Sequence, residues 1–297
     1  MLSILIPIYN FEISHLVSDL NAFANQTRFN IEIICLEDGS TLFLEENSSV
    51  CKSLNHVTHL ISKTNNGRIT SRKHLAKSAT YDWLLFLDAD VEISNKDFIK
   101  DYADFFNSAY EAVYGGCIYD TFKPKPSQLL RWKYGRNFEE VSSSIRNKNP
   151  YKYIVSANFL IKKDTFNKIT NQIKTDGYGY DLFIGQLLMH NKTKILHIDN
   201  AVIHKGLDDN DVFLNKIELS VNTLFSLYKD NKTVDANSTL LKTFKKISSY
   251  GLKPVVNIIF KVFRGVLKKQ LLSSNPNMTL LQFYKLGYLC HLSTVRT

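Results

Sequence analysis

Short apolar runs alternate with helix-like stretches over the first part of the chain. The runs are rich in β-branched and aromatic residues, which predicts strands at 2–8, 31–36, 56–61 and 83–87. Residues 10–25 carry apolar positions at helical spacing, and a second helix is predicted over 68–79. This order of elements predicts a mostly parallel sheet with helices on both faces.

The pattern is less regular in the middle of the chain. It predicts three further strands and one helix, at 112–118, 154–161, 194–203 and 211–227. A polar, arginine-rich insert opens at Lys123-Pro124-Lys125-Pro126, between the first two of these strands. The predicted elements describe one α/β domain up to about residue 230.

Polar residues follow the second and fourth predicted strands. The second ends in Glu37-Asp38-Gly39-Ser40, and the fourth runs into Asp88-Ala89-Asp90. Ligands of parallel α/β sheets bind outside the carboxyl ends of the strands, where these loops emerge. Two neighbouring carboxylates repel unless a cation lies near them, and their hard oxygens suit Mg²⁺ or Mn²⁺. An Asp-rich turn without a ligand is the plainer interpretation of the second motif.

Four motifs in this order resemble those of glycosyltransferase family 2 proteins with a GT-A fold. They are 3–10, 37–40, 66–72 and 88–90, and the resemblance covers about residues 1–230. It implies a Rossmann-like α/β fold and a nucleoside diphosphate sugar as donor, with a UDP-sugar expected. The implied donor-binding residues are Pro7, Tyr9, Asn10, Asp38, Asn66, Gly67, Arg68, Arg72, Asp88 and Ala89.

The resemblance also implies individual roles within this set. Tyr9 would stack on the nucleotide base, Asp38 would contact the base, and Asp88 would meet the ribose or the metal. The arginines at 68 and 72 would lie near the donor. Each residue alone has a plainer interpretation, as a loop aromatic, a helix cap or a solvated helix face.

The implied ligands for Mn²⁺ or Mg²⁺ are Asp88, Asp90 and His204. His197 and His204 lie in one strand-like stretch, where residues seven apart point to opposite faces, so both cannot be ligands in a regular strand. The resemblance favours His204, at the end of the stretch. The alternative is that His204 is a structural histidine.

A second constellation is Asp176-Gly177-Tyr178-Gly179-Tyr180-Asp181, followed by an apolar, helix-like run. Its two glycines suit a loop pressed against a sugar, on which Tyr178 could stack. Family members usually carry Glu-Asp here as the general base, whereas this chain offers only Asp181. The alternative role of Asp181 is to cap the helix.

These assignments imply an inverting transfer. Asp181 would take the proton of an acceptor hydroxyl while the metal neutralises the leaving diphosphate. The expected reaction moves a hexose or N-acetylhexosamine onto a glycan or a lipid-linked saccharide. One alternative is a catalytically impaired sugar-nucleotide-binding or scaffold protein, because a second carboxylate beside Asp181 is missing. A sugar nucleotidyltransferase is the other, although no Gly-rich phosphate loop follows the first strand.

Charge is distributed unevenly along the chain. The net charge is +9, and residues 236–297 hold ten Lys and Arg and no Asp or Glu. The remaining 27 basic and 28 acidic residues leave 1–235 near −1. This break predicts a catalytic domain over 1–235, with a donor half to about 120 and an acceptor half after it, and a basic helical extension over 236–297. It argues against a nucleic-acid partner.

The extension contains a helix-like stretch, 252–272, with a broad apolar face and a cationic stripe. Its charges are too frequent for a spanning helix, so it predicts a helix lying on an anionic inner-membrane surface. Packing on the catalytic domain is the alternative. The four cysteines lack metal or redox spacing and no export segment is recognised, so we expect reduced thiols and a cytoplasmic location, peripheral on the membrane.

Overall fold

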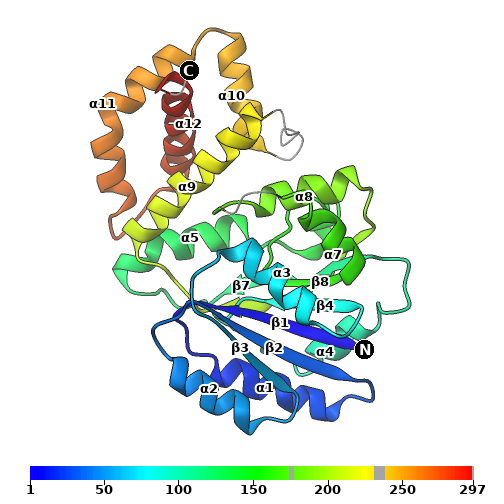
Figure 1. Cartoon of the computed structure of the whole chain (residues 1–297). Coiled ribbons are helices and arrows are strands. Elements are labelled where there is room, and N and C mark those ends of the chain that lie inside the picture. Colours follow the sequence, from blue (N-terminus) through cyan, green and yellow to red (C-terminus); the bar gives the residue numbers. More distant parts are fainter. Residues whose placement is uncertain (174–176, 231–237, 296–297) are drawn as a thin grey trace. The chain divides into compact units, whose positions relative to one another are not determined.

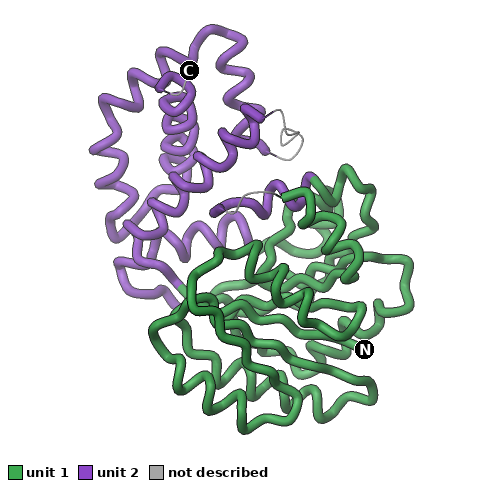
Figure 2. The backbone as a smooth tube through the Cα atoms, in the orientation of Figure 1, with its two compact units in different colours: residues 1–119, 140–176, 187–206 green, residues 120–139, 177–186, 207–297 purple. Residues whose placement is uncertain are grey.

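The computed structural model describes residues 1–173, 177–230 and 238–295, and it divides into two compact units (Figures 1 and 2). Unit 1 comprises 1–119, 140–176 and 187–206, and unit 2 comprises 120–139, 177–186 and 207–297. The chain therefore crosses between the units several times.

Unit 1 is built on a seven-stranded sheet of order β3-β2-β1-β4-β8-β6-β9. Neighbouring strands are parallel except at β8, which is antiparallel to both β4 and β6. The predicted mostly parallel sheet is confirmed. The strands are β1 (Leu2–Ile8), β2 (Ile31–Asp38), β3 (Val57–Ser62), β4 (Trp83–Leu87), β6 (Ala112–Tyr114), β8 (Asn158–Lys162) and β9 (Ile195–His197).

Helices cover both faces of this sheet (Figure 1). The apolar face of α1, which includes Leu16, Val17 and Leu20, packs on one side of β1 in the main core. On the other side α3 contacts β1, β2 and α7. Because both faces are covered, the central strands are almost wholly apolar. The helices of unit 1 are α1 (Ser14–Gln26), α2 (Leu44–Ser53), α3 (Arg68–Ser78), α4 (Phe98–Ala103), α6 (Ser143–Arg146) and α7 (Lys163–Thr170).

Two predicted strands, 112–118 and 194–203, are each broken in two. Their second parts, β7 (Cys117–Tyr119) and β10 (Val202–His204), leave the large sheet and join β5 (Val91–Glu92) in a three-stranded sheet of order β5-β10-β7. The buried Asn158 amide stabilises both breaks, because it donates to Gly116 O at 2.9 Å and Asn200 O at 2.8 Å. Apolar residues flank each break closely on both sides, so the sequence pattern predicted a single strand across Gly115-Gly116 and across Asp199-Asn200.

Unit 2 is helical and has its own apolar core. Leu130, Phe213, Phe260, Leu281 and Tyr284 are buried together in it. The predicted C-terminal helical region is present, and its last helix packs on α9. The helices are α5 (Leu129–Phe138), preceded by the 3-10 turn η1 (Pro126–Gln128), α9 (Asn210–Lys229), α10 (Thr239–Ser249), α11 (Lys253–Leu271) and α12 (Met278–Val295). A further helix, α8 (Asp181–His190), begins in unit 2 and ends in unit 1.

Two other observations concern the whole described chain. No helix among the residues in 1–173, 177–230 and 238–295 is both long enough and apolar enough to cross a membrane. All four cysteines are buried and none forms a disulfide.

Candidate donor site

The predicted donor-binding residues lie at the carboxyl edge of the large sheet. Tyr9 follows β1, Asp38 ends β2, and Asp88 follows β4, and these three strands are parallel neighbours. The last residues paired between β1 and β4 are Leu5 and Phe86, and Pro7 lies beyond them. The N–H that proline lacks therefore removes no hydrogen bond between these two strands. The sheet topology thus brings the four motifs to one edge.

Asn10 holds the loops after β1 and β2 together. Its φ of +52° is left-handed, a conformation that Asn tolerates better than most residues. Asn10 Oδ1 accepts hydrogen bonds from Thr41 N at 2.7 Å and Leu42 N at 3.1 Å, while Asn10 N donates to Ser40 Oγ. Tyr9, the residue before Asn10, is 57% exposed, which leaves its ring accessible for stacking.

Asp38 anchors the turn that leads into α3. Its carboxylate is buried, and Oδ1 accepts from Asn66 N at 2.9 Å while Oδ2 accepts from Gly67 N at 3.1 Å. The Asn66 side chain also donates to Oδ1 at 3.1 Å. The sequence motifs predicted that Asp38, Asn66 and Gly67 lie near one another at the sheet edge. The structure adds that Asp38 positions the other two residues. Its contact with the base stays a prediction.

Arg72, on α3, is buried against Asp88. One Arg72 Nη donates to Asp88 Oδ1, and the other donates to Arg68 O at 3.2 Å. Burial by itself would raise the pKa of Asp88, but the charges of Arg72 and Arg68 hold that pKa below its usual value. Asp88 is therefore a stable anion at the strand end, and Ala89 beside it is buried.

Strand pairing in the small sheet places His204 beside Asp90. The antiparallel pair of β5 and β10 sets His204 opposite Val91, and His204 Nε2 lies 3.5 Å from Asp90 Oδ2. Tyr119 stacks on the His204 ring, with centroids 5.5 Å apart. At Gly206, a Cβ atom would come within 2.0 Å of Asp90 Oδ2, so only glycine fits.

The Asp90–His204 pair has the chemistry of a metal site. Burial raises the pKa of Asp90, His204 opposes the rise, and the Asp88 charge adds to it, so a nearby cation would stabilise the carboxylate. His204 Nδ1 is buried and has no hydrogen-bond partner among the described residues. Mg²⁺ and Mn²⁺ sites commonly use one or two protein ligands and complete the shell with phosphate and water. The pair fits such an ion.

The predicted three-residue ligand set is assembled only in part. Within the described ranges, no three His, Cys, Asp or Glu side chains are grouped so that they could hold a metal ion. Asp88 is engaged by Arg72, whereas Asp90 and His204 face each other. The structure thus brings together two of the three predicted ligands, and the third lies beside them in an ion pair.

His197 has a different environment from His204. The expectation of one strand through both residues is wrong, because they lie in strands of different sheets. Arg146 Nε donates to His197 Nδ1 at 3.2 Å, and His197 Nε2 lies 2.8 Å from Pro150 O. Burial lowers the pKa of His197 to about 4. With both ring nitrogens hydrogen-bonded, His197 is a structural histidine.

Asp181, the predicted base, is the first residue of α8 and belongs to unit 2. The helix opens at the preceding residue, since Ile184 N donates to Tyr180 O at 2.8 Å. Gly179 has a φ of +92°, and a Cβ there would lie 2.9 Å from Ser220 Cβ on α9. The turn before α8 is thus packed closely on α9. Asp176 lies outside the described residues.

The sequence analysis did not identify two residues that contact the Asp90–His204 pair, namely Tyr119 and Gly206. Tyr119 reaches the site only because β7 pairs with β10, and no local pattern predicts that pairing. Gly206 follows the predicted ligand His204 by two residues. A glycine just after a strand end was the one available signal for a close approach of backbone to a ligand.

A family model described as Glycosyl transferase family 2 matches residues 3–173. Among curated proteins, an uncharacterized glycosyltransferase of Rickettsia felis is 29% identical over 118 residues, which are 37% of this chain and 19% of that protein. An uncharacterized glycosyltransferase of Haemophilus influenzae is 37% identical over 91 residues, 30% of this chain and 29% of its own length. The chain therefore matches less than a third of either relative.

Solved structures share the fold at low sequence identity. TarS 1-349 of S. aureus has a TM-score of 0.51 and 15% identity, over 99% of this chain and 91% of that chain. The mannosyltransferase PcManGT from Pyrobaculum calidifontis, in complex with GDP-Man and Mn²⁺, has a TM-score of 0.54 and 10% identity, over 99% and 86%. Glucosyl-3-phosphoglycerate synthase from Mycobacterium tuberculosis, with Mn²⁺ and UDP, has a TM-score of 0.51 and 13% identity, over 75% and 78%.

Proposed function

Because this chain belongs to glycosyl transferase family 2, we propose that it transfers a sugar from a nucleoside diphosphate sugar to a saccharide acceptor with inversion. The observation that carries the proposal is the partly exposed Asp90–His204 pair at the sheet edge, next to the Arg72–Asp88 ion pair. Together they offer two metal-ligating groups and a fixed anion where the motifs place the donor.

The donor nucleotide would lie across the ends of β1, β2 and β4. Tyr9 is exposed and mounted on a loop fixed by Asn10, which suits stacking on a base. Asp38 holds Asn66 and Gly67 at the start of α3, where backbone N–H groups favour anions. A UDP-sugar is the expected donor. Structures of the same fold hold UDP or GDP-Man together with Mn²⁺, which supports a nucleotide-sugar donor of either kind.

Asp90 and His204 would hold the divalent cation, and Asp88 would contribute its charge beside them. When bound, Mn²⁺ or Mg²⁺ would neutralise the diphosphate leaving group. Arg72 keeps Asp88 oriented and ionised, and Gly206 allows the Asp90 carboxylate its position. Stabilising the leaving group at the donor side is the task that these residues share.

Asp181 would act as the general base. It would accept the proton of the acceptor hydroxyl while that oxygen attacks the anomeric carbon from the side opposite the leaving diphosphate. A single displacement of this kind inverts the anomeric centre and needs no protein nucleophile. The first turn of α8 favours a negative charge at this residue.

A pocket in unit 2 supports a saccharide acceptor. Its lining includes Trp132, Lys133, Arg136, Asn275 and Asn277. Amides hydrogen-bond to hydroxyls, and cations favour acceptors with a phosphate or carboxylate, whereas the Trp132 ring is buried and covered by Arg136. We therefore propose a glycan or a lipid-linked saccharide as acceptor, and a hexose or N-acetylhexosamine as the transferred group.

The function can be tested by offering UDP- and GDP-sugars to the full chain with Mn²⁺ or Mg²⁺. We expect slow metal-dependent release of the nucleoside diphosphate, and its loss in Asp90→Asn. A folded chain that binds a nucleotide sugar but never cleaves it would indicate a scaffold protein. Formation of a sugar nucleotide from a nucleoside triphosphate and a sugar phosphate, with pyrophosphate released, would indicate a nucleotidyltransferase. Both results contradict the proposal.

The base assignment needs its own variant. Asp181→Asn should keep donor affinity while transfer to an acceptor falls by roughly 10²-fold or more, the usual scale for a lost general base. Asp211→Asn, in the first turn of α9, is the matched control for charge removal near a helix start. Near-normal turnover in the Asp181 variant would return this residue to helix capping.

A further inference from the structure

Helix α11 has two apolar faces, and only one of them is used inside unit 2. Phe260, Leu267 and Leu271 are buried in the core of that unit. The Phe260 ring packs edge-on against Tyr284 of α12, with centroids 5.3 Å apart, and lies close to Gly287. This face anchors α11 to α12 within unit 2.

The second apolar face of α11 is exposed. Its side chains are 39–68% accessible and recur three or four residues apart, which places them in one stripe along the helix. The stripe consists of Val255, Ile258, Ile259, Val262, Phe263 and Val266. Single exposed apolar residues are scattered on ordinary protein surfaces. A contiguous exposed apolar surface, in contrast, marks an interaction site.

Exposed lysines border the stripe. Lys269 follows Val262 by seven residues and so lies on the same side of α11, and Lys261 lies at its edge. The exposed side of the preceding helix, α10, carries Lys242 and Lys246, while its apolar side is buried. Helices α10, α11 and α12 contain no acidic residue, so no Asp or Glu of these helices offsets the lysines.

The inner cations of α11 are compensated differently. Arg264 Nη2 and Lys268 Nζ lie 3.3 Å and 3.2 Å from Glu218 Oε1 of α9, and Tyr284 OH donates to the same oxygen. Unit 2 thus supplies an acid for the cations that face its interior. The lysines around the stripe face outward, toward whatever covers it.

We propose that the outer face of α11, with the lysines of α10, docks the chain on an anionic membrane surface. An apolar stripe flanked by cations matches the boundary between acyl chains and anionic headgroups. A second copy fits less well, because pairing two such faces would bring their lysines together. A nucleic acid would leave the apolar stripe without a partner. The cytoplasmic leaflet, which is rich in anionic lipid, is the expected location.

This inference is independent of the proposed activity and can be tested by vesicle binding alone. The full chain should co-sediment with vesicles of equal parts phosphatidylcholine and phosphatidylglycerol, and bind at least about tenfold more weakly to phosphatidylcholine alone. High salt should remove part of the binding and leave a salt-resistant remainder from the apolar stripe. Failure to bind the anionic vesicles at low salt would overturn the proposal.

Two variants separate the contributions. Ile258→Ser/Val262→Ser/Val266→Ser should lower vesicle partitioning by at least about tenfold. Lys242→Gln/Lys246→Gln/Lys261→Gln should bring low-salt binding down toward the high-salt level of the wild type. Val212→Ser/Leu219→Ser replaces exposed apolar residues of α9 and should bind as the wild type does. Unchanged circular dichroism and melting midpoints would show that each variant is folded.

Two results would contradict the proposal. The first is a triple-serine variant that partitions onto anionic vesicles as the wild type does. The second is a concentration-dependent dimer in sedimentation velocity that the serine substitutions abolish, together with no vesicle binding by the wild type. That outcome would assign the stripe to a second copy of the chain.

Discussion

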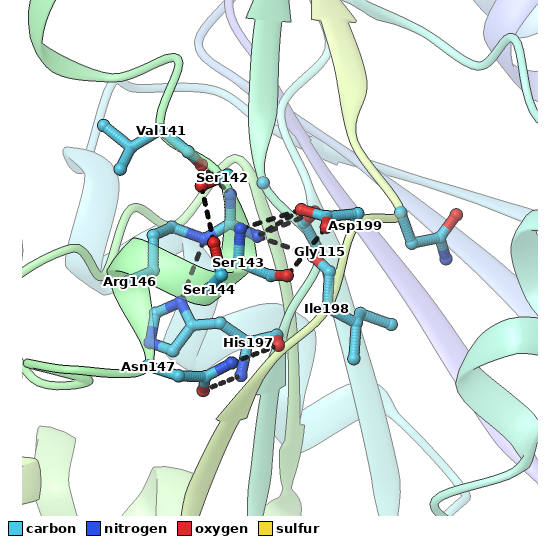
Figure 3. Close-up of polar contacts among 12 residues, drawn as sticks. Gly115, Val141, Ser142, Ser143, Ser144, Arg146, Asn147, His197, Ile198 and Asp199 are labelled. Carbon is cyan, nitrogen blue, oxygen red and sulfur yellow. Dashed lines mark hydrogen bonds and ion pairs between the residues drawn. The ribbon is translucent and has the colours of Figure 1, made fainter.

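Unit 1 contains two partly buried regions that share the same kinds of side chain but differ in how fully their polar atoms are hydrogen-bonded. The proposed metal side of the proposed donor site combines Arg72, Asp88, Asp90 and His204. The Arg146 cluster, shown in Figure 3, combines Arg146, Asp199 and His197. Each region therefore has a buried arginine, an aspartate and a histidine. The difference lies in how completely their polar atoms are paired.

In the Arg146 cluster the pairing is extensive. The Arg146 guanidinium donates to Val141 O, to Gly115 O at 3.3 Å, to Ile198 O at 2.6 Å and to His197. The Asp199 carboxylate accepts from Ser143 N at 2.8 Å and Ser143 Oγ at 2.7 Å (Figure 3). These bonds tie the 141–147 segment to the ends of β6 and β9. The cluster is a structural element.

In the donor site, pairing is incomplete. Arg72 Nε and His204 Nδ1 are buried and have no hydrogen-bond partner in the described part of the chain. Most buried polar atoms in proteins are hydrogen-bonded, so two unpaired ones in a single site need a reason. A bound ligand would supply one. The comparison teaches that two regions with the same residue types can differ in how completely their polar atoms are paired, and we propose that this difference marks the binding region.

The largest expected effect comes from removing one aspartate from each region. Asp90→Ala should abolish metal-dependent donor binding and lower transfer by about 10³-fold, as when charge stabilisation is lost. Asp199→Ala should leave donor affinity unchanged. Titration calorimetry with UDP and Mn²⁺ measures the donor affinity of both variants. Similar losses of affinity in the two variants would break the comparison.

The buried arginine of the structural cluster should matter for stability. Arg146→Leu leaves buried carbonyls without donors, each costing about 1–3 kcal/mol, so the free energy of unfolding should fall by about 3 kcal/mol or more. Urea denaturation measures this change. Arg28→Leu, at an exposed arginine, is the control and should be neutral. A small effect at Arg146 would show that water replaces its hydrogen bonds.

The histidine of the structural cluster should make stability depend on pH. Because burial lowers the pKa of His197 to about 4, the folded state resists a proton that the unfolded state binds near pH 6.5. Stability should therefore be full above pH 6.5 and fall as the pH drops toward 4, by up to about 3 kcal/mol. Urea titrations across this window measure the slope. His197→Gln should flatten it, and an unchanged slope would assign the effect to other groups.

The smallest effect is expected at the exposed edge of the donor site. Tyr9→Ala should weaken nucleotide binding by about tenfold, since stacking on a base is worth about 1–3 kcal/mol. Tyr9→Phe keeps the ring and should bind almost as the wild type does. Fluorescence or calorimetric titration with UDP distinguishes them. Equal affinities for all three proteins would remove Tyr9 from the base-binding site.

The sequence by itself determined the elements and motifs that are local. Strands β1, β2 and β4 and helix α3 lie where the apolar patterns predicted them, and the polar motifs follow the strands as expected. These features depend on neighbouring residues, because apolar periodicity and turn chemistry act over a few positions. The parallel order of the strands then follows from the alternation with helices.

Only the tertiary structure decided which distant residues meet. Asp90 and His204 are neighbours because β5 pairs with β10, and that pairing exists because the chain breaks at Gly116 and Asn200 around the Asn158 amide. The tertiary structure also decided which part of α11 is buried. The sequence shows a broad apolar face on this helix, but α12 and the rest of the unit 2 core cover only part of it. Pairing between distant segments depends on which edges and faces the rest of the fold leaves open, and no local pattern contains that information.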